Sequence, residues 1–186
     1  MALTSDDLDF YLSGAGSDGG AQADPDASLG AYRSSTEITS GADNNIIDDT
    51  SGAEATAGDT EYRCIFVKNA GALPLTSAKV FMVATGNAES AISFAVEVPT
   101  ASDSTGYVQT IADESTSPTV NTGNCSDWST ATTYAGGVAV NINAHDTEVS
   151  AGEIIGIWIR RVVSAGASAA AAITASFTLQ GDTAAA

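Results

Sequence analysis

A change of pattern near Gly58 constrains the fold of this chain more than any other feature. From Thr60 onward, short runs alternate apolar and polar residues, which is typical of strands with one buried face. Before Gly58 the chain is rich in Gly, Ala, Ser and Asp and has no sustained periodicity. We therefore expect an extended N-terminal arm over residues 1–59 and a β-sandwich domain over residues 60–186, where about 125 residues can bury a core.

Seven or so strands are expected in the second part. They occupy residues 61–68, 78–83, 91–98, 107–111, 137–142, 153–163 and 171–179. The run 153–163 is apolar on both faces, so we expect a central strand that is covered on both sides over part of its length. Residues 164–172 are expected to form a loop, and turn residues separate the other runs. The sequence therefore predicts an all-β, antiparallel β-sandwich, immunoglobulin-like or jelly-roll.

The arm carries 12 of the 23 acidic residues and one base, Arg33. Its apolar patches are too short to build a core, so they need another surface. The pattern also predicts a brief strand over Asp9–Ser13, a turn at Asp24–Asp26 and a capping box at Ser51–Glu54 that begins one turn of helix. We expect the apolar patches to dock on a neighbouring subunit or on a partner. The expected anchors are Leu8, Phe10, Tyr11, Ile46 and Ile47.

The formal net charge of −17 bears on possible partners. Such a surface repels nucleic acid phosphates and anionic lipids, so we expect neither as a direct partner. The bases outside the arm lie in or beside expected strands. They are Arg63, Lys68, Lys79, Arg160 and Arg161. Two interpretations remain open: ordinary solvated charges that guard strand edges, or receptors for acidic segments of a neighbouring subunit.

No catalytic residues are expected. His145 is the one histidine, it lies in an apparent turn beside Asp146, and nothing selects a serine to complete a triad. Cofactors and metals are likewise not expected, because one histidine and two separated cysteines do not supply a zinc site. Cys64 and Cys125 allow either one disulfide or free thiols, and Cys64 lies in an apolar strand where a buried thiol behaves as a small hydrophobe.

Two weaker alternatives concern calcium and sugars. Acidic clusters at residues 6–9, 24–26 and 43–49 could bind calcium, although none has the spacing of an EF-hand loop. Aromatic side chains could line a carbohydrate-binding face or pack internally, and Trp158 is expected in the core. The aromatic residues concerned are Tyr62, Tyr107, Trp128, Tyr134 and Trp158.

The segment Gly58–Asn69 resembles a family of tailed-bacteriophage virion structural proteins. Other segments fit the same family in the same order along nearly the whole chain. They are Tyr11–Gly14, Ala23–Gly30, Ser51–Glu54, Ala112–Thr116 and Ile157–Ala167. The resemblance implies a virion component with an immunoglobulin-like or jelly-roll sandwich, and it does not specify which part of the particle.

The expected function is that of a capsid cement or decoration protein, without enzymatic activity, on the exterior of the virion. The first residues lack the features of a signal peptide, so synthesis in the host cytoplasm is expected. The expected partners are the major capsid protein and further copies of the chain, with a homotrimer favoured. Deletion of residues 2–50 should then abolish capsid binding while the sandwich still folds. The alternatives are a head or tail fibre module that binds host glycans, or a neck or tail component.

Overall fold

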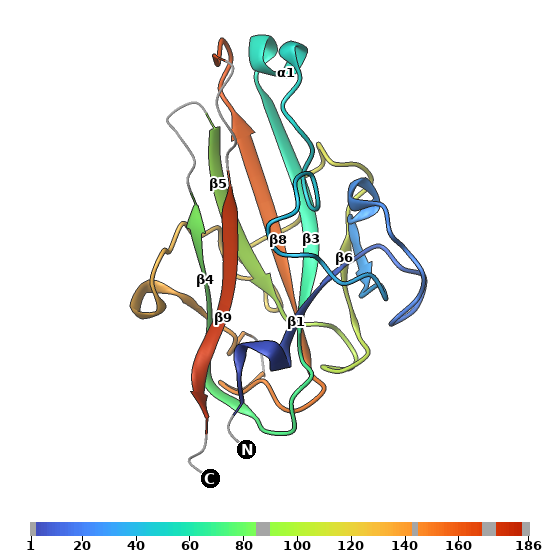
Figure 1. The fold of residues 1–186 in the computed structure, drawn as a ribbon, viewed down its shortest axis with the longest axis vertical. Helices are drawn as coiled ribbons and strands as arrows, with labels where there is room; N and C mark the ends of the chain where they lie inside the picture. The colour runs from blue at the N-terminus through green and yellow to red at the C-terminus, as the bar shows by residue number, and fades with distance from the viewer. Residues whose placement is uncertain (1–2, 85–89, 143–144, 169–173, 184–186) are drawn as a thin grey trace.

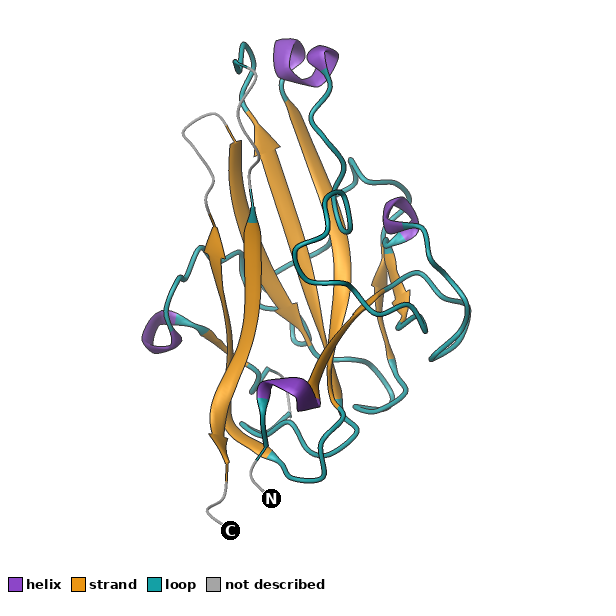
Figure 2. Cartoon of the chain, viewed as in Figure 1, coloured by secondary structure: helices purple, strands orange, loops and turns teal. Residues whose placement is uncertain are grey.

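The computed structural model describes residues 3–84, 90–142, 145–168 and 174–183. It is an antiparallel β-sandwich, as the sequence predicts (Figures 1 and 2). The strands are β1 (Leu8–Leu12), β2 (Gly30–Tyr32), β3 (Asp59–Asn69), β4 (Leu75–Ala84), β5 (Ser90–Glu97), β6 (Tyr107–Thr110), β7 (Val138–Ala139), β8 (Ile154–Val163) and β9 (Ala175–Thr183). The helix α1 covers Gly52–Ala57, and three 3-10 turns cover η1 (Ser5–Asp7), η2 (Pro25–Ala27) and η3 (Tyr134–Gly136).

The strands form three antiparallel sheets. The central sheet has the order β1-β3-β8-β5, the second has β7-β4-β9, and β2 pairs with β6 in a small ribbon. All seven strands expected after residue 60 are present, although β7 has only two residues and residues 171–173 lie outside the described part of the chain. The brief strand expected at Asp9–Ser13 is β1, and the capping box at Ser51 and Glu54 begins α1.

The main core fills the space between the central sheet and the sheet β7-β4-β9. It contains the fully buried side chains of Val80 from β4, Phe94 and Val96 from β5, and Ile157 from β8. Ile92, Phe94 and Val96 of the run 91–98 share this face, which confirms the expected period of two for these positions. Alternating positions on facing sheets therefore supply most of the apolar burial that holds these two layers together.

A second core covers the opposite face of the central sheet. Cys64 and Phe66 from β3 and Trp158 from β8 are fully buried there, beneath the ribbon β2-β6 and the loops around Ile111 and Cys125. The strand β8 pairs with β3 on one side and β5 on the other, so the expected central strand with two buried faces is confirmed. The ribbon adds a third layer to the two facing sheets. The sequence did not predict a strand at β2.

Candidate functional site

The five expected anchors lie against the chain's own sandwich. Leu8, Phe10 and Tyr11 belong to β1, which pairs with β3 from Leu8 opposite Asn69 to Leu12 opposite Ile65. The side chains of Leu8, Phe10, Ile46 and Ile47 pack on the main core, and Tyr11 packs on the second core. The expectation that these side chains need the surface of another molecule is wrong, because the sandwich supplies that surface itself. Residues 3–58 are therefore not a free arm.

Two strand arginines hold acidic segments of the same chain. Arg63, completely buried, contacts Asp26 at 3.0 Å and Glu114 at 2.5 Å. Burial alone would lower the pKa of Arg63, but hydrogen bonds to these carboxylates outweigh it and the pKa is raised. Arg63 therefore does bind acidic side chains, as one of the two interpretations of the strand bases predicts. These acids come from the same chain and not from a neighbouring subunit.

Arg161 forms the second internal link. It is 8% exposed, donates to the carbonyl oxygen of Asp48 at 2.6 Å and forms an ion pair with Glu61. Burial raises the pKa of Glu61 to about 7, although the positive charge of Arg161 opposes this shift. Asp48 follows Ile46 and Ile47 directly, so a polar contact fixes the place where these two apolar side chains reach the sandwich.

Aromatic contacts engage two of the remaining bases. The guanidinium carbon of Arg160 lies 4.6 Å from the ring centroid of Trp128, and the Lys79 ammonium lies 5.2 Å from that of Tyr134. Such contacts stabilise partly exposed aromatic rings. Trp158 is fully buried, as expected, and its indole N–H donates to Glu97 at 2.6 Å.

Both cysteines are buried free thiols. Burial, together with the nearby Glu97 carboxylate, raises the pKa of Cys64 well above its ordinary value and raises the pKa of Cys125 to about 12. Because the thiolate is the reactive form, both side chains act as packing groups at neutral pH. Of the two states that the sequence allows, the structure contains free thiols.

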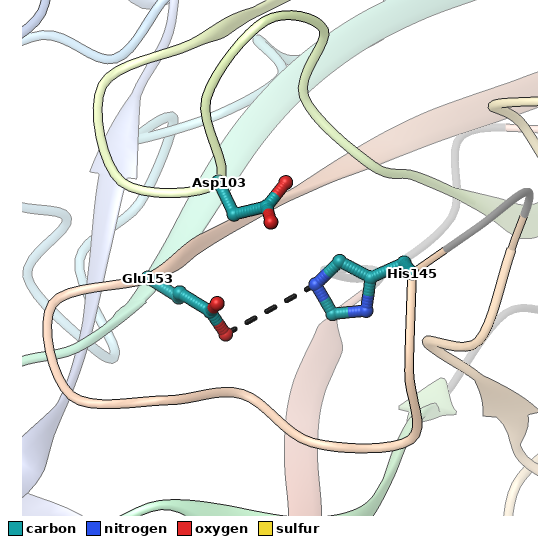
Figure 3. Close-up of side chains that lie close together, drawn as sticks. All are labelled: Asp103, His145 and Glu153. Carbon is teal, nitrogen blue, oxygen red and sulfur yellow. Dashed lines mark ion pairs between the residues drawn. The ribbon is translucent and has the colours of Figure 1, made fainter.

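The residues Asp103, His145 and Glu153 converge at the end of the sandwich where β8 begins (Figure 3). Asp103 comes from the loop between β5 and β6, and His145 and Glu153 come from the connection between β7 and β8. Their ligand atoms all lie within 4.8 Å of one another, and the Nε2 atom of His145 lies 4.0 Å from Glu153 Oε2. We call this group the Asp–His–Glu cluster. The sequence predicts only a turn around His145, because Asp103 comes from a different loop and no local pattern connects the three residues.

Backbone contacts position each member of the cluster. The carbonyl of Asp103 accepts from the N–H of Ile154 at 2.6 Å, which holds the loop against the first residue of β8. The backbone N–H of Ser150 donates to Glu153 Oε2 at 2.5 Å, and Nδ1 of His145 lies 2.9 Å from the carbonyl oxygen of Asp146. Burial raises the pKa of Glu153, and the hydrogen bond from Ser150 and the nearby His145 partly offset this shift.

A second acidic group, Glu54, Asp59 and Glu61, also brings its carboxylate oxygens within 4.8 Å of one another. Neither group in the described part of the chain includes an acid from residues 6–9, 24–26 or 43–49, where the sequence suggested calcium. In the described residues His145 contacts the Asp146 carbonyl and the Glu153 carboxylate. Neither is a hydroxyl or thiol nucleophile, so these contacts do not form a Ser-His-Asp triad.

The longest unpaired strand edge in the described part of the chain belongs to β9, which pairs only with β4. The outer face of this sheet exposes Val83 of β4, a residue that is 55% exposed and lies opposite Ser176 of β9. On the other side of the molecule Tyr107 is 42% exposed and its ring lies 5.4 Å from that of Tyr32.

Comparisons with known proteins give no relative. No family model, no curated protein and no solved structure matches the chain. Among the described residues, no helix has the length and apolar character needed to cross a membrane.

Proposed function

We propose that this chain is a structural protein of a tailed-phage virion, a cement or decoration subunit that attaches to the outside of the capsid shell. The sequence resemblance and the β-sandwich support this assignment. The observation that carries it is the edge of β9 that no other described strand pairs, which lies beside the exposed Val83 and the half-buried Phe81 of β4. In this proposal the sandwich makes the attachment, and residues 3–58 serve as an internal brace.

Backbone hydrogen bonds show which groups of β9 are available. Met82 donates its N–H to the carbonyl of Ala131 at 3.0 Å, so its backbone groups point away from β9. Phe177 lies opposite Met82. In an antiparallel pair, two opposite residues direct their backbone N–H and C=O groups either toward each other or both away from each other. Phe177 and, two residues on, Leu179 therefore direct their N–H and C=O groups toward the free edge. A strand from a neighbouring molecule can pair with them.

The side chains beside this edge suit a contact with another protein. Val83 is exposed and Phe81 is half-buried on the outer face of the sheet, where Ser176 and Gln180 are the exposed neighbours from β9. Free edges are commonly guarded by Lys or Pro, and β9 contains neither. We assign the major capsid protein as the partner, with further copies of the chain completing a homotrimer at each site.

The test is binding of the purified chain to expanded, DNA-free capsid shells, followed by cryo-electron microscopy to locate it. The variant Ser176→Lys with Gln180→Lys places one ammonium group opposite Val83 and a second opposite Lys79, both from β9. We expect its shell affinity to fall by roughly tenfold or more, because burying an unpaired charge costs more than about 1.4 kcal/mol. Ser17→Lys is the matched control, since Ser17 is exposed on a different part of the molecule.

Two results would count against the proposal. If the unmodified chain does not bind shells under any salt condition, the capsid function is wrong. If it binds and the β9 variant binds equally well, attachment to the shell stands and the β9 surface is wrong. Normal circular dichroism and melting of each variant establish that it is folded.

A second candidate, a glycan-binding fibre module, is favoured by one observation. Tyr107 is exposed beside a cleft that Gln109, Asn124 and Thr122 line with polar groups, and aromatic rings with nearby hydrogen-bonding groups are suited to sugars. The substitution Tyr107→Ala separates the two functions. It should reduce adsorption to host cells if the chain is a fibre module, and it should leave shell binding unchanged if the chain is a decoration protein.

A further inference from the structure

We propose that Asp103, His145 and Glu153 bind one divalent transition-metal ion, and that zinc is the ion this set of ligands selects. The site would join the β5–β6 loop to the β7–β8 connection at the end of the sandwich where β8 begins (Figure 3). This inference is independent of the proposed capsid function.

The buried imidazole is the observation that points to a ligand. The side chain of His145 is only 3% exposed, and its Nε2 atom is buried without a hydrogen-bond partner. Its Nδ1 atom lies 2.9 Å from the carbonyl oxygen of Asp146, and a carbonyl can only accept, so Nδ1 carries the proton. In the neutral ring Nε2 therefore presents a lone pair toward the two carboxylates. A carbonyl bound to the remote nitrogen is the usual support for a metal-ligating histidine.

The two carboxylates supply negative charge on the side of the cluster that Nε2 faces. Glu153 is 20% exposed and its Oε2 atom is fixed by the N–H of Ser150, while Asp103 is exposed on a loop whose backbone is tied to β8. Ligands at about 2.0–2.2 Å from a tetrahedral zinc lie roughly 3.3–3.5 Å apart. The present separations are within 4.8 Å, and His145 Nε2 lies 4.0 Å from Glu153 Oε2. Binding therefore needs the exposed Asp103 side chain to move inward and the His145 and Glu153 side chains to approach each other by about half an ångström. A fourth position stays open to solvent.

The ligand types decide among metals. Calcium and magnesium take oxygen ligands and fill their coordination shells with carboxylates, carbonyls and water. A buried imidazole with two carboxylates instead suits zinc and its neighbours in the first transition row, and zinc binds such a site more tightly than manganese does. The other acidic group is less suited to a cation, because the guanidinium of Arg161 already pairs with its Glu61 member.

The experiment uses the full chain after treatment with a chelator. Titration with zinc chloride, followed by calorimetry, should give one site per chain. Because His145 is the one histidine of the sequence, NMR of the imidazole nitrogens reports on this site alone. We expect the neutral, metal-free ring to carry its proton on Nδ1, and zinc to shift the Nε2 signal selectively. Cobalt substitution should give the intense visible absorption of a four-coordinate ion.

Variants separate this site from other acids. Asp103→Asn, Glu153→Gln and His145→Ala should each weaken zinc binding by roughly 100-fold or more, since each removes a direct ligand. Asp103→Asn is the variant least apt to disturb folding, because the Asp103 side chain is exposed. Glu148→Gln is the matched control, being an acid of the same connection outside the cluster, and it should bind zinc as the unmodified chain does.

Three results would overturn the proposal. The first is the absence of stoichiometric zinc binding by the unmodified chain. The second is zinc binding that persists in Asp103→Asn and His145→Ala but is lost in Asp59→Asn, which would place the ion at the other acidic group. The third is calcium binding as tight as zinc binding, which would show that the imidazole nitrogen is not a ligand.

Discussion

The N-terminal third and the body of this molecule are both ordered, but different forces hold them. Strands β3, β4, β5, β8 and β9 bury alternating apolar side chains between sheets, and the central strands bury both faces. Residues 3–58 contribute one five-residue strand, one three-residue strand and a six-residue helix. Internal ion pairs at Arg63 and Arg161 and a few apolar contacts attach the rest. A segment without a core of its own can therefore still be an integral layer of the fold.

Deletion of residues 2–50 tests this comparison most severely. We now expect the truncated chain to lose cooperative folding, because it loses β1 from the central sheet and the buried Leu12 and Ala15. Arg63 would also remain buried without its Asp26 partner. Urea denaturation followed by tryptophan fluorescence measures the effect. Adding the peptide 1–50 in trans should restore a cooperative transition, whereas a truncated chain with unchanged stability would show that the segment is only an appendage.

The substitution Phe94→Ala tests the body of the molecule. Phe94 is fully buried in the main core, so its truncation should lower the free energy of unfolding by about 3–5 kcal/mol. The loss should appear as one global shift of the denaturation midpoint. Phe10→Ala is the matched comparison, since Phe10 packs on the same core but is only partly buried, and it should cost less. An equal or larger loss for Phe10→Ala would mean that the N-terminal segment is as central as the core.

The sequence predicted the body well because period-two burial is a local signal. The runs 91–98 and 153–163 show in their own residues which faces are covered, and the structure agrees. The N-terminal segment carries no such signal, because its order depends on distant contacts. Arg63 meets Asp26, and Arg161 meets the backbone of Asp48 from the other end of the chain. Acidic residues in a strongly acidic chain do not reveal which of them is paired.

The Asp–His–Glu cluster was missed for the same reason. His145 and Glu153 lie in one connection, and Asp103 lies in another loop that only the backbone contact to Ile154 brings close. The useful signal in the sequence was small: the one histidine of the chain lies in a polar segment with acids nearby. A single imidazole identifies a binding site only after folding shows that it is buried and that one nitrogen has no partner.

The substitution Arg63→Met tests the polar attachment directly. Methionine fills the buried position with an apolar side chain of similar length, but it cannot make the contacts to Asp26 and Glu114. We expect a loss of about 2–3 kcal/mol, less than for a fully buried unpaired charge, because both carboxylates are about half exposed and can be hydrated. Hydrogen exchange should increase around residues 24–28 more than in β5. Arg160→Met is the control, because Arg160 contacts Ser93 and Trp128, which lie outside residues 24–28. It should leave hydrogen exchange in residues 24–28 unchanged.

The smallest expected effect comes from Glu61, which lies beneath the same attachment. Its pKa is raised to about 7 in the folded chain because burial disfavours the carboxylate, so the folded state retains a proton that the unfolded chain has released. Stability due to this group is therefore fully present below about pH 4.5 and is lost as the pH rises through about 7. Asp48, Arg63, Glu114 and Arg161 also act on this carboxylate.

The variant Glu61→Gln isolates that contribution, because an amide cannot ionise. With chelator present to exclude metal effects, denaturation at several pH values between 4.5 and 8 should show that the advantage of the variant over the unmodified chain grows with pH. Glu148→Gln, an acid of the β7–β8 connection, should keep the parental pH dependence. If Glu61→Gln instead becomes less stable than the unmodified chain as the pH rises, the ion pair with Arg161 outweighs burial. The polar attachment of the N-terminal segment would then be stronger than the comparison with the apolar core implies.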